Sequence, residues 1–209
     1  MSNHPEKPYN DIPLLPPKAD IETKEVLKLA IEANKALAEL NFATKMLPDP
    51  TVLINTIPLQ EAKASSEIEN IVTTSDELFR ASFTDNTDVD SATKETLRYR
   101  QALKAGCEML TAKPITTNMI CEICSIIKNT EMNIRKVSGT QIKNIATGEV
   151  LYTPPEGEKV IRDLLSNWER FLNENTDFDP LVKMAVLHYQ FEAVHPFLDG
   201  NGRTGRILN

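Results

Sequence analysis

Apolar residues recur at helical spacing along most of the 209-residue chain. Three stripes repeat every three or four residues, which is the period of one helix face. They comprise Tyr99, Ala102, Leu103, Gly106, Met109 and Leu110; Ile120, Ile123, Cys124 and Ile127; and Ile161, Leu164, Leu165, Trp168, Phe171 and Leu172. We interpret each stripe as the core-facing side of a helix, and the pattern therefore predicts a mostly α fold.

Capping signals indicate where further helices begin. Asp20 is placed to cap a helix whose apolar positions are Leu27, Ala30, Ile31, Leu37 and Leu40. The Pro-Asp-Pro sequence that follows would end this helix, and its Asp49 and Pro50 suit the cap and first turn of a short helix. Asp179, followed by proline, is expected to open another helix.

Two segments depart from the helical pattern. The first 19 residues are rich in proline and are expected to form an extended arm. In residues 139–155, two short strand-like runs flank Thr147 and Gly148, which is typical of a β-hairpin. The predicted fold class is therefore mostly α with one β-hairpin.

Composition and net charge favour some classes of partner and one type of cellular compartment over others. The net charge of −7 disfavours a nucleic-acid surface spread over the whole protein, leaves a local basic pocket possible, and favours proteins or small molecules as partners. No apolar run is long enough to span a bilayer, and the first residues lack the features of a signal peptide. Three cysteines suit a reducing compartment. We expect a cytoplasmic protein that enters no membrane.

Cys121 and Cys124 form a Cys-x-x-Cys pair that requires its own interpretation. Cys124 lies on a predicted core stripe, and no second Cys or His pair is available to complete a tetrahedral zinc site. We therefore interpret the pair as part of the core, with a redox or zinc role as the less favoured alternative.

The twelve residues 195–206, HPFLDGNGRTGR, combine one titratable base, one carboxylate, two arginines and three glycines. The glycines spell Gly-x-Gly-x-x-Gly, but this fingerprint indicates a dinucleotide site only after a buried strand. Residues 182–192, which precede the loop, are instead predicted to be helical. The Gly-Lys-Ser/Thr of a Walker loop is also missing from the sequence.

The same loop has the composition of a phosphate site. Its glycines let the backbone approach an anion, and the helix that follows offers free N–H groups. Arg203 and Arg206 can each make bidentate contacts to phosphate oxygens. Asp199 suits Mg²⁺, which prefers a carboxylate together with phosphate oxygens.

HPFLDGNGRTGR resembles the His-x-Phe-x-Asp/Glu-Gly-Asn-Gly-Arg-x-x-Arg motif of Fic proteins at every defining position. The preceding FEAVHPF, the hairpin ending in YTPP and the N-terminal helical region extend the likeness. The resemblance implies a Fic-type helical bundle that transfers AMP from ATP to a Ser, Thr or Tyr hydroxyl of a target protein.

The resemblance also implies roles for individual residues. His195 would be the general base, Phe197 would anchor the loop in the core, and Asp199 would bind Mg²⁺. The nucleotide phosphates would be held by Gly200, Asn201, Gly202, Arg203 and Arg206. The hairpin would be the flap that pairs with the target backbone, through Gln141, Ile142 and Lys143. His188 is expected to be structural, and His4 to face solvent.

A second motif lies far upstream, in residues 61–70. On a helix, Ala62, Ser65, Ser66 and Glu69 would share one face of small residues that ends in a carboxylate. Taken alone, this spacing favours an exposed acid on a surface helix. Ser65, Glu69 and Asn70 nevertheless match the Ser/Thr-x-x-x-Glu-Gly/Asn inhibitory motif of Fic proteins, and this match implies that Glu69 pairs with Arg206 and obstructs ATP.

The resulting domain prediction has an arm over residues 1–19, an N-terminal helical region over 20–90 and a Fic core over 91–209. The inhibitory helix is expected at about residues 58–72. Because Ile207 and Leu208 look like the start of an apolar stripe, we expect further Fic-core helices beyond the sequence. Two other functions stay open: removal of AMP from modified targets, and peptide binding without catalysis. The target protein and homo-oligomer formation also stay open.

Overall fold

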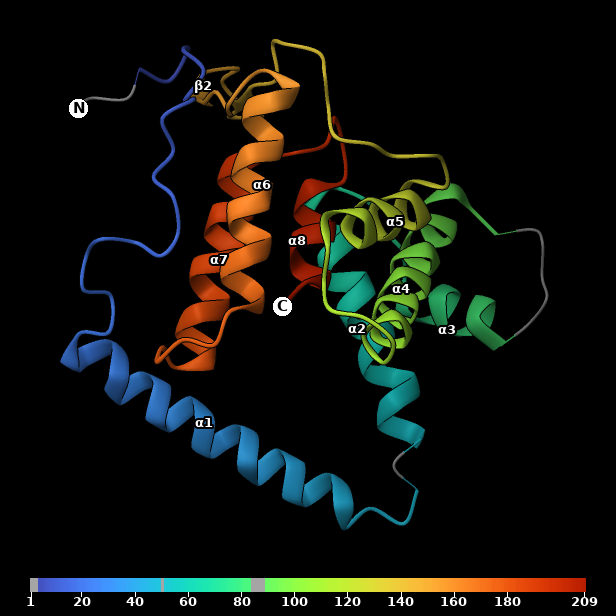
Figure 1. Ribbon diagram of the computed structural model, residues 1–209. Helices are drawn as coiled ribbons and strands as arrows, with labels where there is room; N and C mark the ends of the chain where they lie inside the picture. The colour runs from blue at the N-terminus through green and yellow to red at the C-terminus, as the bar shows by residue number, and fades with distance from the viewer. Residues whose placement is uncertain (1–3, 50, 84–88) are drawn as a thin grey trace.

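The computed structural model describes residues 4–49, 51–83 and 89–209 and is largely helical (Figure 1). Over these residues the elements are α1 (Lys24–Lys45), α2 (Thr51–Ile68), α3 (Ser75–Phe83), α4 (Ser91–Leu110), α5 (Thr117–Lys128), β1 (Ile142–Lys143), β2 (Val150–Tyr152), α6 (Glu158–Asn173), α7 (Pro180–Val194) and α8 (Asn201–Ile207). The two strands are antiparallel, with Ile142 opposite Tyr152. The mostly α fold class with one hairpin is confirmed.

One hydrophobic core joins the antiparallel pair α6 and α7 to the loop that precedes α8. Trp168 and Phe171 from α6 pack with Phe191 from α7, and Phe197 of the loop is fully buried beside them. The Trp168 indole N–H donates to the Leu187 carbonyl at 2.8 Å, so its polar atom is satisfied inside the core. This core fixes the start of the predicted phosphate loop, residues 195–206.

A second core lies between α4 and α5. Ala102 of α4 packs with Met119, Ile123 and Ile127 of α5. Leu208, at the end of α8, packs against both cores, and α8 contacts α2, α4, α5 and α7. Figure 1 shows α8 in the middle of the molecule, between the α6–α7 pair and the α2–α4–α5 group. The arrangement brings side chains from both groups to the phosphate loop.

Over residues 4–19 the N-terminal arm consists of turns, bends and irregular backbone, and it packs along the α6–α7 pair. Ile12 and Leu15 are buried in the first core. The Leu15 backbone N–H donates to the side chain of Asn167 at 2.7 Å, and the Asn167 amide donates back to the Leu15 carbonyl at 2.9 Å. The Gln190 amide donates to the Pro13 carbonyl. His4 is exposed, as predicted.

Several sequence predictions are confirmed. The stripe from Ile120 to Ile127 is buried on α5, and five of the six residues of the α6 stripe are buried. Asp179 caps α7, accepting from the N–H groups of Leu181 and Val182. On α4 the buried residues include Tyr99, Ala102 and Gly106, whereas Leu110 is 50% exposed because it lies at the end of the helix.

Other predictions about the N-terminal region are wrong. The cap of α1 is Thr23 rather than Asp20, because the Thr23 hydroxyl accepts from the Val26 N–H at 3.4 Å. The helix after the Pro-Asp-Pro sequence is not short, because α2 runs continuously from Thr51 to Ile68. It also begins well before residue 58. Pro50 lies outside the described residues.

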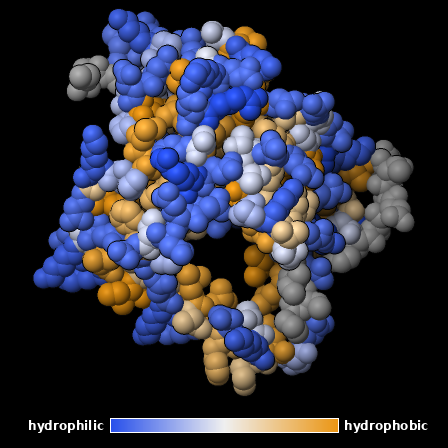
Figure 2. Space-filling model, in the orientation of Figure 1, coloured by the Kyte–Doolittle hydropathy of each residue, from blue (hydrophilic) through white to orange (hydrophobic). Residues whose placement is uncertain are grey.

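Most of the apolar side chains of α1 are exposed. Of the helix's residues only Ala30 is buried, and Ile31 is 69% exposed. Figure 2 shows an opening between part of α1 and the helices above it, with hydrophobic residues along part of its border, while α1 also contacts α7. No helix in the described part of the chain combines the length and the apolar character needed to cross a bilayer.

Candidate active site

His195 terminates α7 in a left-handed conformation, with a φ of 49°. Its backbone N–H donates to the Phe191 carbonyl at 2.9 Å. The buried guanidinium of Arg135 donates to the carbonyls of His195 at 2.8 Å and Val194 at 3.3 Å. A cation at a helix C-terminus is favoured by the exposed carbonyls and the helix dipole. Arg135 therefore fixes the backbone that presents the histidine.

The surroundings of His195 favour its neutral form. Burial lowers the pKa of His195, and the charge of Arg135 lowers it further. The backbone carbonyl of Glu192 and the carboxylates of Glu69 and Asp199 act in the opposite direction without reversing the shift. The ring Nδ1 is buried without a hydrogen-bond partner. A neutral imidazole at neutral pH is able to accept a proton.

The loop between His195 and α8 is held by its own residues. The Asn201 side chain accepts from the Phe197 N–H and donates to the Phe197 carbonyl, both at 2.8 Å. Gly200 has a φ of 82°, a conformation that favours glycine, and its carbonyl accepts from the Thr204 N–H to begin α8. Asn201 is thus engaged in bracing the turn, while its role toward phosphate stays a prediction.

Arg206 is bound by residues at the end of α2. Its Nε donates to the Ser65 hydroxyl at 2.6 Å, and its Nη2 donates to the Ser65 carbonyl at 3.0 Å. Nη2 also donates to Glu69 Oε1 at 3.0 Å. Ser65 and Glu69, predicted from a six-residue pattern, therefore meet the second arginine of a motif about 140 residues away.

Glu69 lies directly against the phosphate loop. A β-carbon placed on Gly202 would stand 2.5 Å from Glu69 Oε1. Glu69 itself follows α2 in a turn, rather than lying on the helix, and its N–H donates to the Ser66 carbonyl. Asn70 then adopts a left-handed conformation with a φ of 60°. Asn70 thus ends the turn that aims the carboxylate at α8, which suits the tolerance of asparagine for this region.

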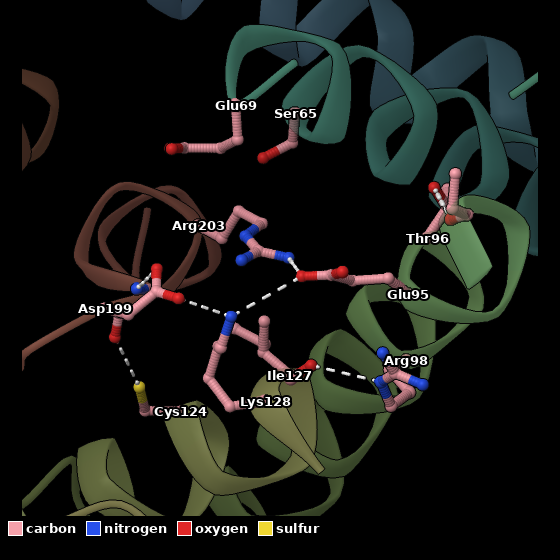
Figure 3. Close-up of polar contacts among 12 residues, drawn as sticks. Ser65, Glu69, Glu95, Thr96, Arg98, Cys124, Ile127, Lys128, Asp199 and Arg203 are labelled. Atoms are coloured by element: carbon pink, nitrogen blue, oxygen red, sulfur yellow. Dashed lines mark hydrogen bonds and ion pairs between the residues drawn. The ribbon is translucent and has the colours of Figure 1, made fainter. Parts of the chain in front are cut away.

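Four charged side chains alternate in sign on the other side of the loop (Figure 3). Lys128 Nζ lies 2.5 Å from Asp199 Oδ2 and 3.6 Å from Glu95 Oε1. The same Glu95 oxygen accepts from Arg203 Nη1 at 2.6 Å. Arg203 is 2% exposed, and its Nε is buried without a hydrogen-bond partner. Arg203 therefore has one unpaired donor, which is enclosed by the protein.

Sequence reasoning missed Glu95, Lys128 and Arg135. Glu95 lies in a polar run of α4, and Lys128 is the last residue of α5, so neither belongs to a recognisable motif. Arg135 lies in the irregular segment between α5 and the hairpin. Only the tertiary structure brings these three side chains to the loop.

Asp199, the predicted Mg²⁺ ligand, is paired with Lys128 in the structure. Burial raises the pKa of Asp199, but the hydrogen bond and charge of Lys128 and the Gly200 N–H outweigh it, so the net pKa is lowered. The Asp199 side chain is 61% exposed, and its carboxylate forms an ion pair with the Lys128 ammonium. The described residues contain no cluster of three or more His, Cys, Asp or Glu side chains that could form a complete metal site. Asp199 fits Mg²⁺ as one ligand beside phosphate oxygens.

The remaining predicted residues lie around this centre. Gln141 and Ile142 are half-buried and Lys143 is exposed on the hairpin, whose Tyr152 hydroxyl donates to the Ala193 carbonyl of α7 at 2.9 Å. His188 Nδ1 lies 3.3 Å from the Gly205 carbonyl, which fits a structural role. Cys124 is fully buried, and burial raises the pKa of its thiol to about 11. The core interpretation of Cys124 fits this environment.

Sequence comparison defines the class of protein. The profile of the Fic/DOC family N-terminal region matches residues 27–108, and that of the Fic/DOC family matches residues 114–209. The chain belongs to the Fic/DOC family. It is similar to protein adenylyltransferase fic-1 of Caenorhabditis elegans, with 41% identity over 58 residues, which are 27% of this chain and 11% of that protein. Protein adenylyltransferase Fic of Drosophila melanogaster is 39% identical over 56 residues, 26% of this chain and 11% of that protein.

Two solved structures share the fold. A Fic family protein from Desulfovibrio desulfuricans superposes with a TM-score of 0.71 at 21% identity, covering 92% of this chain and 57% of that chain. Fic-1 from Caenorhabditis elegans superposes with a TM-score of 0.63 at 21% identity, covering 90% of this chain and 62% of that chain. The superposed parts thus span less than two thirds of either solved chain.

Proposed function

We propose that this protein transfers AMP from ATP to a hydroxyl side chain of a target protein and that Glu69 restrains the transfer. The observation that carries the proposal is the binding of Arg206 by Ser65 and Glu69, directly over the loop that begins at His195. Membership of the Fic/DOC family and the names of the relatives support the reaction class.

The proposed reaction assigns His195 to proton transfer. Because Nδ1 is buried, Nε2 is the nitrogen left to take the proton from the target hydroxyl. The hydroxyl oxygen forms a bond to the α-phosphorus of ATP, and the bond from that phosphorus to the β-phosphate bridging oxygen breaks. Pyrophosphate leaves. Arg203 and Arg206 provide the cationic contacts for the phosphates, and Mg²⁺ held by Asp199 would supply charge neutralisation when bound.

The proposed restraint follows from competition for one guanidinium. In the structure three hydrogen bonds to Ser65 and Glu69 occupy Arg206 Nε and Nη2. The Glu69 carboxylate also fills the space over Gly202, where a phosphate would approach the backbone. Two anions cannot share this place without repulsion, so productive seating of the ATP γ-phosphate requires Glu69 to move away.

The reaction assignment is tested by incubating the protein with α-labelled ATP, Mg²⁺ and a cell lysate. We expect His195→Ala to lower label transfer by roughly 10²–10⁴-fold, as for loss of a general base, while nucleotide binding persists. All proteins in this comparison also carry Glu69→Gly, so that the proposed restraint by Glu69 does not mask the effect of the second substitution. His188→Asn is the matched control, because its amide nitrogen can take the place of Nδ1 in the contact to the Gly205 carbonyl, and it should retain transfer.

Two results would contradict the proposal. Unchanged labelling with His195→Ala would remove His195 from the reaction. Release of label from an already modified target, without any transfer, would instead favour AMP removal as the activity.

A further inference from the structure

Lys128 lies between two carboxylates, those of Asp199 and Glu95. Its ammonium contacts Asp199 at 2.5 Å, and Glu95 lies 3.6 Å away on the opposite side (Figure 3). Asp199 is 61% exposed, whereas the Lys128 and Glu95 side chains are 21% and 23% exposed. The ammonium therefore has a second, more sheltered carboxylate within a short movement of its present partner.

The phosphate loop is shaped around the Lys128 side chain. A β-carbon on Gly200 would lie 3.3 Å from Lys128 Cδ and 3.4 Å from Cγ. The left-handed Gly200 thus lets the aliphatic stem pass close to the backbone that joins Asp199 to α8. This packing holds the stem in place and leaves the terminal ammonium as the part that can move.

We propose that Lys128 is an exchangeable counter-ion: it neutralises Asp199 while no nucleotide is bound and shifts to Glu95 when a metal–nucleotide takes Asp199. The inference rests on the proposed function and adds Lys128 and Glu95 to it as positioning residues.

The exchange connects the carboxylate to the buried arginine. Glu95 Oε1 is shared, since it accepts from Arg203 Nη1 at 2.6 Å and also faces Lys128. A closer Lys128 satisfies more of the Glu95 charge and weakens its attraction for Arg203. Arg203 Nη1 then becomes freer to bind a phosphate oxygen. Occupation of Asp199 and release of Arg203 would therefore occur together.

The proposal predicts opposite effects for two neutral substitutions. Lys128→Met keeps the aliphatic stem against Gly200 but removes the ammonium that competes with Mg²⁺ for Asp199. Less Mg²⁺ should therefore be needed to tighten ADP binding. Glu95→Gln removes the second carboxylate, so Lys128 stays on Asp199 and more Mg²⁺ should be needed to tighten ADP binding, whereas ADP binding without Mg²⁺ should strengthen because Arg203 is released. Each change is expected to be about twofold to fivefold, because a partly exposed ion pair contributes little.

The test is calorimetric binding of ADP to the 209-residue chain at rising Mg²⁺ concentrations. ADP lacks the γ-phosphate, so the Glu69 restraint does not enter. The Mg²⁺ concentration that gives half of the maximal tightening is compared among wild type, Lys128→Met and Glu95→Gln. Lys159→Met is the matched control, because it removes an equally short but exposed ion pair to Asp163, and it should behave as wild type.

The outcomes separate this inference from the proposed function. The exchange is supported if the half-maximal Mg²⁺ concentration falls for Lys128→Met and rises for Glu95→Gln. Shifts in the same direction, no shift, or ADP binding weakened equally with and without Mg²⁺ by Lys128→Met would overturn it. If the wild type bound no ADP at any Mg²⁺ concentration, the proposed function would fail as well. Should Lys128→Met not fold, Lys128→Gln provides a second neutral replacement.

Discussion

The chemistry of single residues in this protein is set by neighbours that are distant in sequence. His195 is ordinary as a side chain, but burial and the charge of Arg135 lower its pKa, and the Arg135 guanidinium holds the carbonyls of the turn that presents it. Arg206 is likewise defined by Ser65 and Glu69. The loop supplies the reactive groups, and other segments set their charge state and availability.

A pH dependence follows from the lowered pKa of His195. Its neutral form should persist below the ordinary value of 6.5, so the acidic limb of the transfer rate is expected below that pH. Arg135→Met removes a positive charge and should move this limb toward higher pH. Rate–pH profiles of both proteins, recorded with Glu69→Gly present, provide the measurement. Arg135→Lys keeps the charge and should stay near the parent profile, and an unmoved limb in Arg135→Met would argue against the electrostatic role.

The same shift has a consequence for stability. Because the folded-state pKa lies below the unfolded value, His195 binds protons more readily in the unfolded chain. Its contribution to stability is therefore fully present above about pH 6.5 and is lost as the pH falls from there through the folded pKa.

Among the elements, α7 is the helix that presents His195. Its last turn ends at His195, and its first turn is capped by Asp179. Asp179 Oδ1 accepts from the Leu181 and Val182 N–H groups, and Oδ2 accepts from Asn34 Nδ2 of α1 at 2.9 Å. One carboxylate thus begins the helix and ties α1 to it.

Asp179→Ala should destabilise the protein by about 1 kcal/mol, the usual cost of losing a helix cap. Urea unfolding followed by circular dichroism gives the comparison. Asp163→Ala is the matched control, since Asp163 lies on an exposed face of α6 in an ion pair with Lys159, and it should change the free energy of unfolding far less. Equal losses in the two variants would mean that the cap contributes nothing particular.

Local sequence signals predicted the elements better than their ends and partners. The stripes of α5 and α6, the Asp179 cap and the hairpin were predictable because helix period, capping and turn chemistry are local. The cap of α1 was not, since Asp20 and Thr23 are both good N-caps and only the path of the arm decides between them. The length of α2 was also missed, because Pro58 lies inside that helix instead of ending it.

On the scale of the whole molecule, the candidate site joins parts that have separate cores. The α6–α7 core holds His195 and Phe197, the α4–α5 group brings Glu95 and Lys128, and the end of α2 with the turn after it brings Ser65 and Glu69. From sequence, only the two motifs were recognisable, and their pairing came from family resemblance. Glu95 and Lys128 could not be predicted, because their ion pairs depend on how α4 and α5 pack against α8.

The central claim is that Glu69 holds back a transfer reaction by occupying Arg206. Its most direct test is label incorporation from α-labelled ATP and Mg²⁺ by the wild type, Glu69→Gly and Arg206→Ala at equal concentration. Glu67→Gly is the matched control, since it also replaces an exposed glutamate near the end of α2 with glycine. The Glu67 carboxylate pairs with Lys63 and not with Arg206. We predict that Glu69→Gly raises labelling above wild type, whereas Glu67→Gly leaves it unchanged and Arg206→Ala, which loses the phosphate contact as well, does not raise it. Equal labelling by wild type and Glu69→Gly, with transfer detectable in both, would contradict the claim.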